Sequence, residues 1–325
     1  MSEVPTARGH VDSSHLGKTL VHEHVFVLGE EYRNNYQDDW DENQKVAEAV
    51  ADLNELKRLG IDTIMDPTVL GLGRYIPRIQ RIAEQTDLNI VVATGLYTYN
   101  DIPQQFHYRG PGLLLDIPEP LTELFIRDLT EGIGDTGVRA AFLKCAIDEP
   151  GLTPGVERVM RAAGQAAVDT GVPITVHTHS GTRSGLVAQR VLAEEGVDLS
   201  RVIIGHAGDS TDLDYLSKLA EAGSLLGMDR FGLDLFLPLQ NRIDTIVELV
   251  RRGYGSSIVI SHDASCFIDF LTPGEKRAMA PNWNYRHISE DVLPAFLDAG
   301  LTEADIDTIL TANPRRHFEG SASID

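Results

Sequence analysis

The chain has 325 residues, 42% hydrophobic and 24% charged, a profile typical of soluble globular proteins rather than disordered ones. Its 49 acidic and 28 basic residues give a net charge of −21, which excludes nucleic acid and anionic membrane surfaces as expected partners. We see no apolar leader or membrane-spanning run, and two cysteines are too few for a disulfide framework, so a cytoplasmic protein is expected.

Eight short apolar or β-branched runs recur along the chain, separated by stretches with helical periodicity. The runs cover residues 18–28, 60–68, 88–99, 140–148, 172–180, 200–208, 224–232 and 256–265. The helical stretches include residues 43–59, 154–170 and 241–252, and the last helices are expected around 288–313, before the motif NPRRHFEG. Buried strands that alternate with amphipathic helices indicate a parallel sheet of βα units.

Eight βα units predict a closed (β/α)₈ barrel, the TIM-barrel architecture of the α/β class. An open doubly wound sheet is the alternative, although the chain carries no glycine fingerprint for a dinucleotide. No linker or low-complexity segment divides the sequence. We therefore expect one domain over residues 1–325, with a short N-terminal extension before the first strand.

The first run contains the motif TLVHEHVFV, residues 19–27, with two histidines flanking a glutamate. The zinc motif H-E-x-x-H does not fit, because Phe26 stands where its second histidine would be. On a strand, His22 and His24 share one face, whereas Glu23 points the other way and is expected to be structural. Two imidazoles on one strand face are half of a metal site.

Further ionisable residues stand near the ends of later strands, where barrel enzymes carry their chemistry. They are Lys144 on the fourth strand, His177 on the fifth, His206 on the sixth and Asp263 on the eighth. A lone strand histidine is usually a core residue, and a lone aspartate such as Asp66 usually caps a turn. Four histidines and an aspartate at equivalent heights instead predict a site for zinc or a similar divalent metal.

Lys144 is unusual because it stands in the apolar run AAFLKCAI. Burial lowers a lysine pKa, and a neutral amine can react with carbon dioxide to form an anionic carbamate. The two carbamate oxygens could bridge two metals. The alternative is a snorkelling lysine paired with a carboxylate.

The order of these histidines, the lysine and the aspartate along the chain resembles that of the amidohydrolase superfamily. Within this superfamily, the chain resembles the phosphotriesterase-like lactonases of the phosphotriesterase family. The matching segments are GKTLVHEH, FLKCA, VPITVHTHSG, VIIGHAGD, GMDRFG, VISHDAS and NPRRHF. The resemblance implies a binuclear centre. It assigns His22, His24 and Asp263 to one metal and His177 and His206 to the other, bridged by carboxylated Lys144 and a hydroxide.

By the same resemblance, the bridging hydroxide attacks a carbonyl carbon, and Asp263 moves its proton to the leaving oxygen. Zinc is the expected metal, with cobalt, iron or manganese as alternatives. Tyr97 matches a tyrosine of the lactonase branch, and Arg230 an arginine near the lactone pocket. The alternative for Arg230 is a salt bridge at the barrel rim, with Asp229 or Asp234.

Other positions are expected to contact the substrate or to lie beside the site. Tyr99, Cys266 and Phe270 are predicted substrate contacts, and neither Cys145 nor Cys266 is a predicted nucleophile. His179 is predicted to be a loop residue. The segment 264–285 reads as a long loop, whose apolar side chains would either line a groove for an acyl chain or pack the loop onto the barrel. These side chains are Phe267, Phe270, Met279 and Trp283.

The implied function is a lactonase that opens N-acyl-homoserine lactones, a quorum-quenching activity, with promiscuous hydrolysis of organophosphate triesters. A dedicated phosphotriesterase (aryldialkylphosphatase) is one alternative. A metal-bearing barrel that binds a ligand without turnover is the other. The family habit implies a homodimer.

Overall fold

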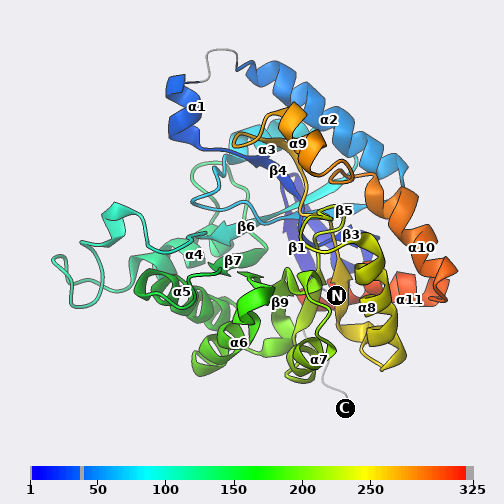
Figure 1. The fold of residues 1–325 in the computed structure, drawn as a ribbon. Coiled ribbons are helices and arrows are strands. Elements are labelled where there is room, and N and C mark those ends of the chain that lie inside the picture. Colours follow the sequence, from blue (N-terminus) through cyan, green and yellow to red (C-terminus); the bar gives the residue numbers. More distant parts are fainter. Residues whose placement is uncertain (1, 37–39, 320–325) are drawn as a thin grey trace.

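The structure, a computed structural model, describes residues 2–36 and 40–319 and contains an eight-stranded parallel barrel (Figure 1). Its strands run in the order β3-β5-β6-β7-β8-β9-β10-β11, and every neighbouring pair is parallel. They span Thr19–Leu20, Thr63–Asp66, Asn89–Gly95, Phe142–Ile147, Ile174–Thr178, Val202–Gly205, Leu225–Met228 and Ile258–Ile260. Between the first and last strands, Val21 N donates to Ile260 O at 3.5 Å. The (β/α)₈ barrel is confirmed, and the open sheet was the wrong alternative.

Helices follow the strands and surround the barrel (Figure 1). They are α2 (Glu42–Arg58), α3 (Ile76–Ala83), α4 (Pro120–Thr130), α5 (Pro154–Thr170), α6 (Ser184–Glu194), α7 (Leu213–Glu221) and α8 (Leu239–Arg251). α5 has the bounds that were predicted for it, because residues typical of helix termini stand at both of its ends. Thr153 caps its first turn and Pro154 opens it, whereas Gly171 ends it in a left-handed conformation at φ 73°.

The first predicted strand is broken. β3 ends at Leu20, and a separate strand β4 (His24–Val27) pairs in parallel with β12 (Ser265–Ile268). We call this contact between residues 21–27 and residues 260–268 the seam, because it joins the two ends of the barrel. His22 O accepts from Asp263 N at 3.0 Å, and His24 N donates to Ala264 O at 2.8 Å.

Glu23 explains the break in the first strand. Its side chain is fully buried and turns away from the two histidines, as the alternation predicted. Oε1 accepts from Ser261 Oγ at 2.9 Å and from both N and Nδ1 of His262, at 2.8 and 2.6 Å. Oε2 accepts from Ala264 N at 3.0 Å. The carboxylate thus replaces strand pairing across the seam.

We predict that Glu23→Gln lowers the free energy of unfolding by about 3 kcal/mol, because an amide cannot satisfy four buried donors that a carboxylate now satisfies. Urea denaturation of the metal-free protein measures this. Glu48→Gln, on the exposed side of α2, is the control and should change the free energy by less than about 0.5 kcal/mol. Equal losses in the two variants would show that Glu23 has no special role at the seam.

The rest of the chain adds elements that the sequence reading did not resolve. The N-terminal extension forms an antiparallel hairpin, β1 (Glu3–Thr6) with β2 (Gly9–Asp12), and Ala7 N donates to Ile90 O on β6. The predicted loop 264–285 contains β12 and the helix α9 (Pro273–Met279), which starts at a capping box of Thr272 and Glu275. The remaining helices are α1 (Glu30–Tyr36), α10 (Leu293–Asp298), α11 (Glu303–Asp307) and α12 (Asn313–Glu319).

α12 takes up most of the motif NPRRHFEG, whose Gly320 lies outside the described residues. Short π-helical segments, Ile288–Val292 and Thr308–Ala312, precede α10 and α12. In the described part of the chain, no helix combines the length and the apolarity needed to cross a bilayer. One domain over residues 1–325 stays a prediction.

Candidate metal centre

The barrel brings the six predicted ligands together at the carboxyl ends of its strands. His22 lies in the break before β4, His24 begins β4, and Lys144 and His177 lie in β7 and β8. His206 follows β9 directly, and Asp263 follows β11. Asp263 stands at the centre. Its Oδ1 lies 3.5 Å from Nε2 of His22 and 3.3 Å from Nε2 of His24, and its Oδ2 lies 3.9 Å from Nε2 of His206.

The backbone is strained at two of these residues. His206 has φ 63° and Asp263 φ 54°, in the left-handed region that favours glycine. Among the described residues other than glycine, only Arg183 shares a positive φ. Such conformations each cost about 1–3 kcal/mol and gather at functional sites. The strain turns both side chains inward from the strand ends.

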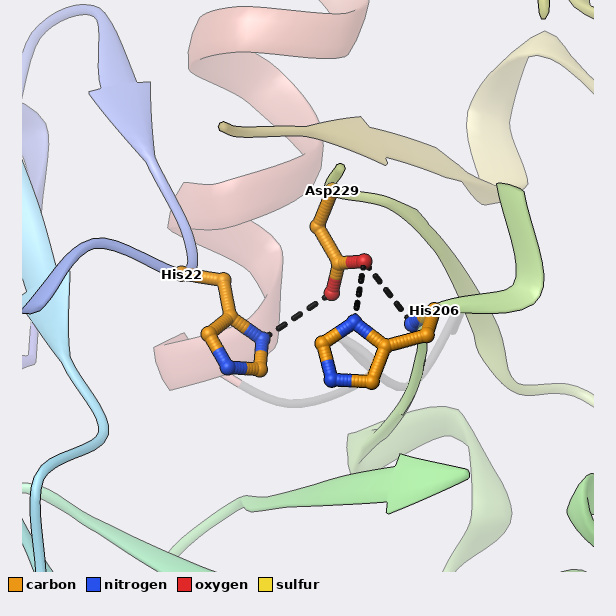
Figure 2. Close-up of side chains that lie close together, drawn as sticks. All are labelled: His22, His206 and Asp229. Carbon is orange, nitrogen blue, oxygen red and sulfur yellow. Dashed lines mark hydrogen bonds and ion pairs between the residues drawn. The ribbon is translucent and has the colours of Figure 1, made fainter. Parts of the chain in front are cut away.

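Two of the imidazoles are held by one carboxylate. Asp229, which follows β10, accepts from His22 Nδ1 through Oδ2 at 3.0 Å and from His206 Nδ1 through Oδ1 at 3.0 Å (Figure 2). Oδ1 also accepts from His206 N at 2.8 Å. With its proton on Nδ1, each imidazole turns the lone pair of Nε2 toward Asp263.

The other two imidazoles have acceptors of their own. His24 Nδ1 donates to Thr68 Oγ1 at 2.7 Å, and that hydroxyl donates to Asp66 Oδ1 at 2.5 Å. His177 Nε2 donates to Asp148 Oδ2 at 2.6 Å, which leaves the lone pair on Nδ1. Fixing one ring nitrogen so that the other can bind a cation is the usual environment of metal-binding histidines.

The donor set fits divalent metal ions. Nε2 of His206 and Nδ1 of His177 lie 2.8 Å apart, so the lone pairs of these two nitrogens are directed at the same point in the site. Burial lowers the pKa of His177 to about 4 and that of His206 well below its usual value, so both rings are neutral, the form that binds metal. Burial would raise the pKa of Asp263, but nearby His22, His206 and Arg230 hold it well below its usual range. Neutral imidazoles around a carboxylate suit zinc and similar ions.

Lys144 is buried at the same place, with 1% of its surface exposed, so it does not snorkel to solvent. Nζ donates to Nε2 of His22 at 3.1 Å, a neutral partner rather than a carboxylate. Burial lowers the pKa of this amine to about 8. A share of the side chain is therefore uncharged near neutral pH, as carbamate formation requires.

A cavity of about 300 Å³ opens onto the cluster. Its polar end includes Tyr97 and Arg230 beside the predicted ligands, whereas its outer wall is mainly apolar: Leu72, Leu233, Leu235, Phe236, Phe270 and Met279. The Tyr97 ring stands edge-on to His177, with centroids 5.2 Å apart. Burial and the charge of Asp148 raise the Tyr97 pKa to about 12, so its phenol stays protonated.

Arg230 points into the site rather than along the rim. Nε donates to Asp263 Oδ2 and Nη1 to Asp209 Oδ2, both at 3.0 Å. The alternative salt bridge with Asp229 or Asp234 is therefore wrong: Asp229 serves the imidazoles, and Asp234 accepts from Asn282. The guanidinium thus holds the central carboxylate from the cavity side.

Some predicted contacts are not among the residues that line the cavity. Cys266, on β12, lies instead beside the Tyr285 hydroxyl, with Sγ 3.5 Å from it. Phe267 is also absent from the lining and packs on Trp40, with centroids 5.1 Å apart. Tyr99 lies at the surface beside Glu149.

Phe270, Met279 and Trp283 do line the cavity. His179 is outside it, where its side chain caps a short turn by accepting from Thr182 N, as expected of a loop residue.

The acceptors behind the histidines were missing from the sequence reading. Asp148 and Asp229 follow β7 and β10 directly, so the rule that located the ligands, ionisable residues at strand ends, also applies to them. Asp66 caps a turn as predicted, by accepting from Thr68 N at 2.9 Å, but the same oxygen also orients the hydroxyl that holds His24. No pattern in the sequence indicated that Thr68 lies between Asp66 and His24.

Fold and donor cluster together define a class: a (β/α)₈ barrel whose buried donors suit divalent metal ions. The model of the phosphotriesterase family matches residues 2–318, and the chain belongs to that family. It is 57% identical over 320 residues to a "phosphotriesterase homology protein" of Mycobacterium tuberculosis, covering 98% of each chain. It is 41% identical over 310 residues to an "aryldialkylphosphatase" of Saccharolobus solfataricus, covering 95% of this chain and 96% of the relative.

A solved structure described as the phosphotriesterase from Mycobacterium tuberculosis superimposes on the present one with a TM-score of 0.96. The two sequences are 57% identical, and the match covers 98% of each chain.

Proposed function

We propose that the protein is a lactonase that opens N-acyl-homoserine lactones with two metal ions, and that it hydrolyses organophosphate triesters as a side activity. His22, His24 and Asp263 would hold one ion and His177 and His206 the other, with a carbamate on Lys144 between them. When bound, the ions supply Lewis acidity and lower the pKa of water to give a nucleophile at neutral pH. Zinc is the proposed metal; cobalt, iron and manganese accept the same donors.

The chain's own residues handle the proton and the substrate. Ring opening adds water across the acyl C–O bond, so one proton must pass from the attacking water to the leaving ring oxygen. Asp263 is the proposed carrier, because its carboxylate is ionised and faces the cavity. Arg230 keeps Asp263 oriented at 3.0 Å, and the protonated Tyr97 phenol can donate to a lactone oxygen.

One observation carries the choice of substrate: a single cavity joins the ionisable cluster to an apolar wall. An N-acyl-homoserine lactone likewise combines a polar lactone ring with an apolar acyl chain. The volume of such a molecule suits a cavity of about 300 Å³. Phe270 closes this wall although 67% of its surface is exposed, an exposure that a bound chain would reduce. We further propose that the protein is cytoplasmic, as the low cysteine count indicated, and a homodimer, as the resemblance implied.

Removing Phe270 tests the apolar wall. We expect Phe270→Ala to raise KM for a long-chain acyl-homoserine lactone by about 5–10-fold, the loss of roughly 1 kcal/mol of apolar contact, with kcat nearly unchanged. A short-chain lactone should be affected less than twofold. Tyr108→Ala, which removes an exposed aromatic side chain outside the cavity, is the control. Equal changes for both chain lengths would contradict the proposed position of the acyl chain.

The proposed activity is tested by kcat/KM of the zinc-loaded protein on a long-chain acyl-homoserine lactone and on the triester paraoxon. The lactone should be preferred by several orders of magnitude. The relative named aryldialkylphosphatase supports the second candidate, a dedicated phosphotriesterase, which a preference for paraoxon would establish. Two bound zinc ions without turnover of either compound would refute both and favour a binding protein or another substrate class.

A further inference from the structure

We propose that Asp229 is a positioning residue shared by both metal positions, so that its loss releases both ions, whereas loss of any other histidine acceptor releases only one. The inference rests on the proposed two-metal centre. It concerns how the protein retains its metals.

Each carboxylate oxygen of Asp229 contacts a proposed ligand of a different metal ion. Oδ2 accepts from His22, a proposed ligand of the first ion, and Oδ1 accepts from His206, a proposed ligand of the second (Figure 2). Both bonds are 3.0 Å long, and the side chain has no exposed surface.

The barrel leaves room for this carboxylate at two glycines. A Cβ on Gly227 would lie 2.6 Å from Asp229 Oδ2, and a Cβ on Gly205 would lie 3.2 Å from the same oxygen. Gly205 ends β9, and Gly227 lies in β10. Neighbouring strands thus omit side chains where the carboxylate stands, which fixes it between the two imidazoles.

The other acceptors serve one imidazole each. Thr68 contacts His24 at the first position, and Asp148 contacts His177 at the second. Losing an acceptor of this kind typically weakens metal binding about 10–100-fold, because the histidine is no longer held in the tautomer and orientation that bind metal. Removal of Thr68, Asp148 or Asp229 as an acceptor is therefore expected to cause a different pattern of metal loss in each case.

Asp229 also links the two positions energetically. A cation on Nε2 makes the Nδ1–H of the same ring a stronger donor, which tightens its bond to the carboxylate. Once one oxygen is held by His22, rotation of the carboxylate is restricted and the other oxygen is already placed for His206. The entropy of ordering this group is therefore lost once for two ions. Its negative charge also offsets the repulsion between two nearby cations.

The test compares zinc retention by wild type, Asp229→Asn, Thr68→Val and Asp148→Ala. An amide has one acceptor oxygen and turns its NH₂ group toward the other imidazole, whose proton must then move to the nitrogen that faces the metals. Each metal-free protein is loaded with zinc and bicarbonate and dialysed against EGTA, at the highest concentration at which wild type still keeps two ions. Bound zinc is then measured by mass spectrometry. Asp229→Ala is made in parallel, and the metal-free melting temperatures check folding.

We expect Asp229→Ala, which removes both acceptor oxygens, to keep clearly less than one ion per chain. Asp229→Asn, which keeps one acceptor oxygen, should keep about one ion, and so should Thr68→Val and Asp148→Ala, which each remove the acceptor of one imidazole. A variant that melts like metal-free wild type and still loses both ions supports the inference. Retention of one or two ions by Asp229→Ala would overturn it. A wild type that never binds two ions would instead refute the proposed two-metal centre, whatever the variants do.

Discussion

Asp263→Asn should lose nearly all turnover, with kcat/KM lower by about 10³–10⁴, near the upper end of what a proton-transfer residue contributes. Asparagine has nearly the same size as aspartate, but it lacks the negative charge that attracts both the proposed metal ion and the guanidinium of Arg230. In the structure its two oxygens lie 3.3 Å from His24 Nε2 and 3.0 Å from Arg230 Nε. An amide must turn its NH₂ toward one of them. Steady-state kinetics on an acyl-homoserine lactone, with zinc content measured on the same sample, gives the result.

Asp234→Asn is the matched control, because Asp234 is a nearby carboxylate that contacts Asn282 instead of the cluster. Its kcat/KM should stay within about twofold of wild type. If Asp263→Asn kept a tenth or more of the activity, another group would have to carry the proton. If the variant lost zinc as well as activity, the metal-binding role of Asp263 would be supported, and its role in proton transfer would need a variant that keeps both ions.

The second large effect is expected at Lys144. Lys144→Gln should lower kcat/KM more than about 100-fold, since even the loss of a group behind a ligand costs 10–100-fold and Lys144 is the proposed bridge. Wild-type reactivation from the metal-free state should speed up with added bicarbonate. It should also speed up from pH 6 to pH 8, because carbamate forms from the neutral amine. With a pKa of about 8, the neutral fraction grows from about 1% at pH 6 to about 50% at pH 8.

The measurement is the rate at which activity returns after zinc is added, with and without bicarbonate at fixed pH. Lys45→Gln, which removes a lysine paired with Glu48 on α2, should leave that rate unchanged. Reactivation that ignores bicarbonate would contradict the carbamate, and full activity in Lys144→Gln would exclude any role for the amine in the centre.

The barrel was predictable because its strands are buried on both sides and therefore read as continuous apolar runs. β7 (Phe142–Ile147) and β8 (Ile174–Thr178) fall within their predicted runs for that reason. The prediction of one continuous strand over residues 18–28 was wrong. The apolar pattern is the same whether residues pair within the sheet or across the seam. Only the long-range bonds of Glu23 to residues 261–264 show why the strand breaks there, and no local pattern encodes them.

The clustering of the candidate ligands was predictable because ionisable side chains in apolar strands are costly, so a set of them at one height is informative. Side-chain direction was harder to predict beyond the strand ends. Phe270 and Cys266 lie in one loop segment, yet only Phe270 reaches the cavity: Cys266 lies on β12, whereas Phe270 follows that strand. Arg230 was expected near the substrate, but its bond to Asp263 depends on how two loops meet. The shared role of Asp229 depends on three strands at once.

The seam also decides when the centre can assemble in the cell. Glu23 and His262 are 239 positions apart, so at 5–20 residues per second the ribosome needs about 10–50 s to make the second after the first. Throughout that time β4 has no partner, because β12 has not been made, and His22 and His24 lack Asp263 beside them. Metal loading at this proposed position would therefore follow translation, and a chain released before β12 carries His22 and His24 beside an unpaired strand.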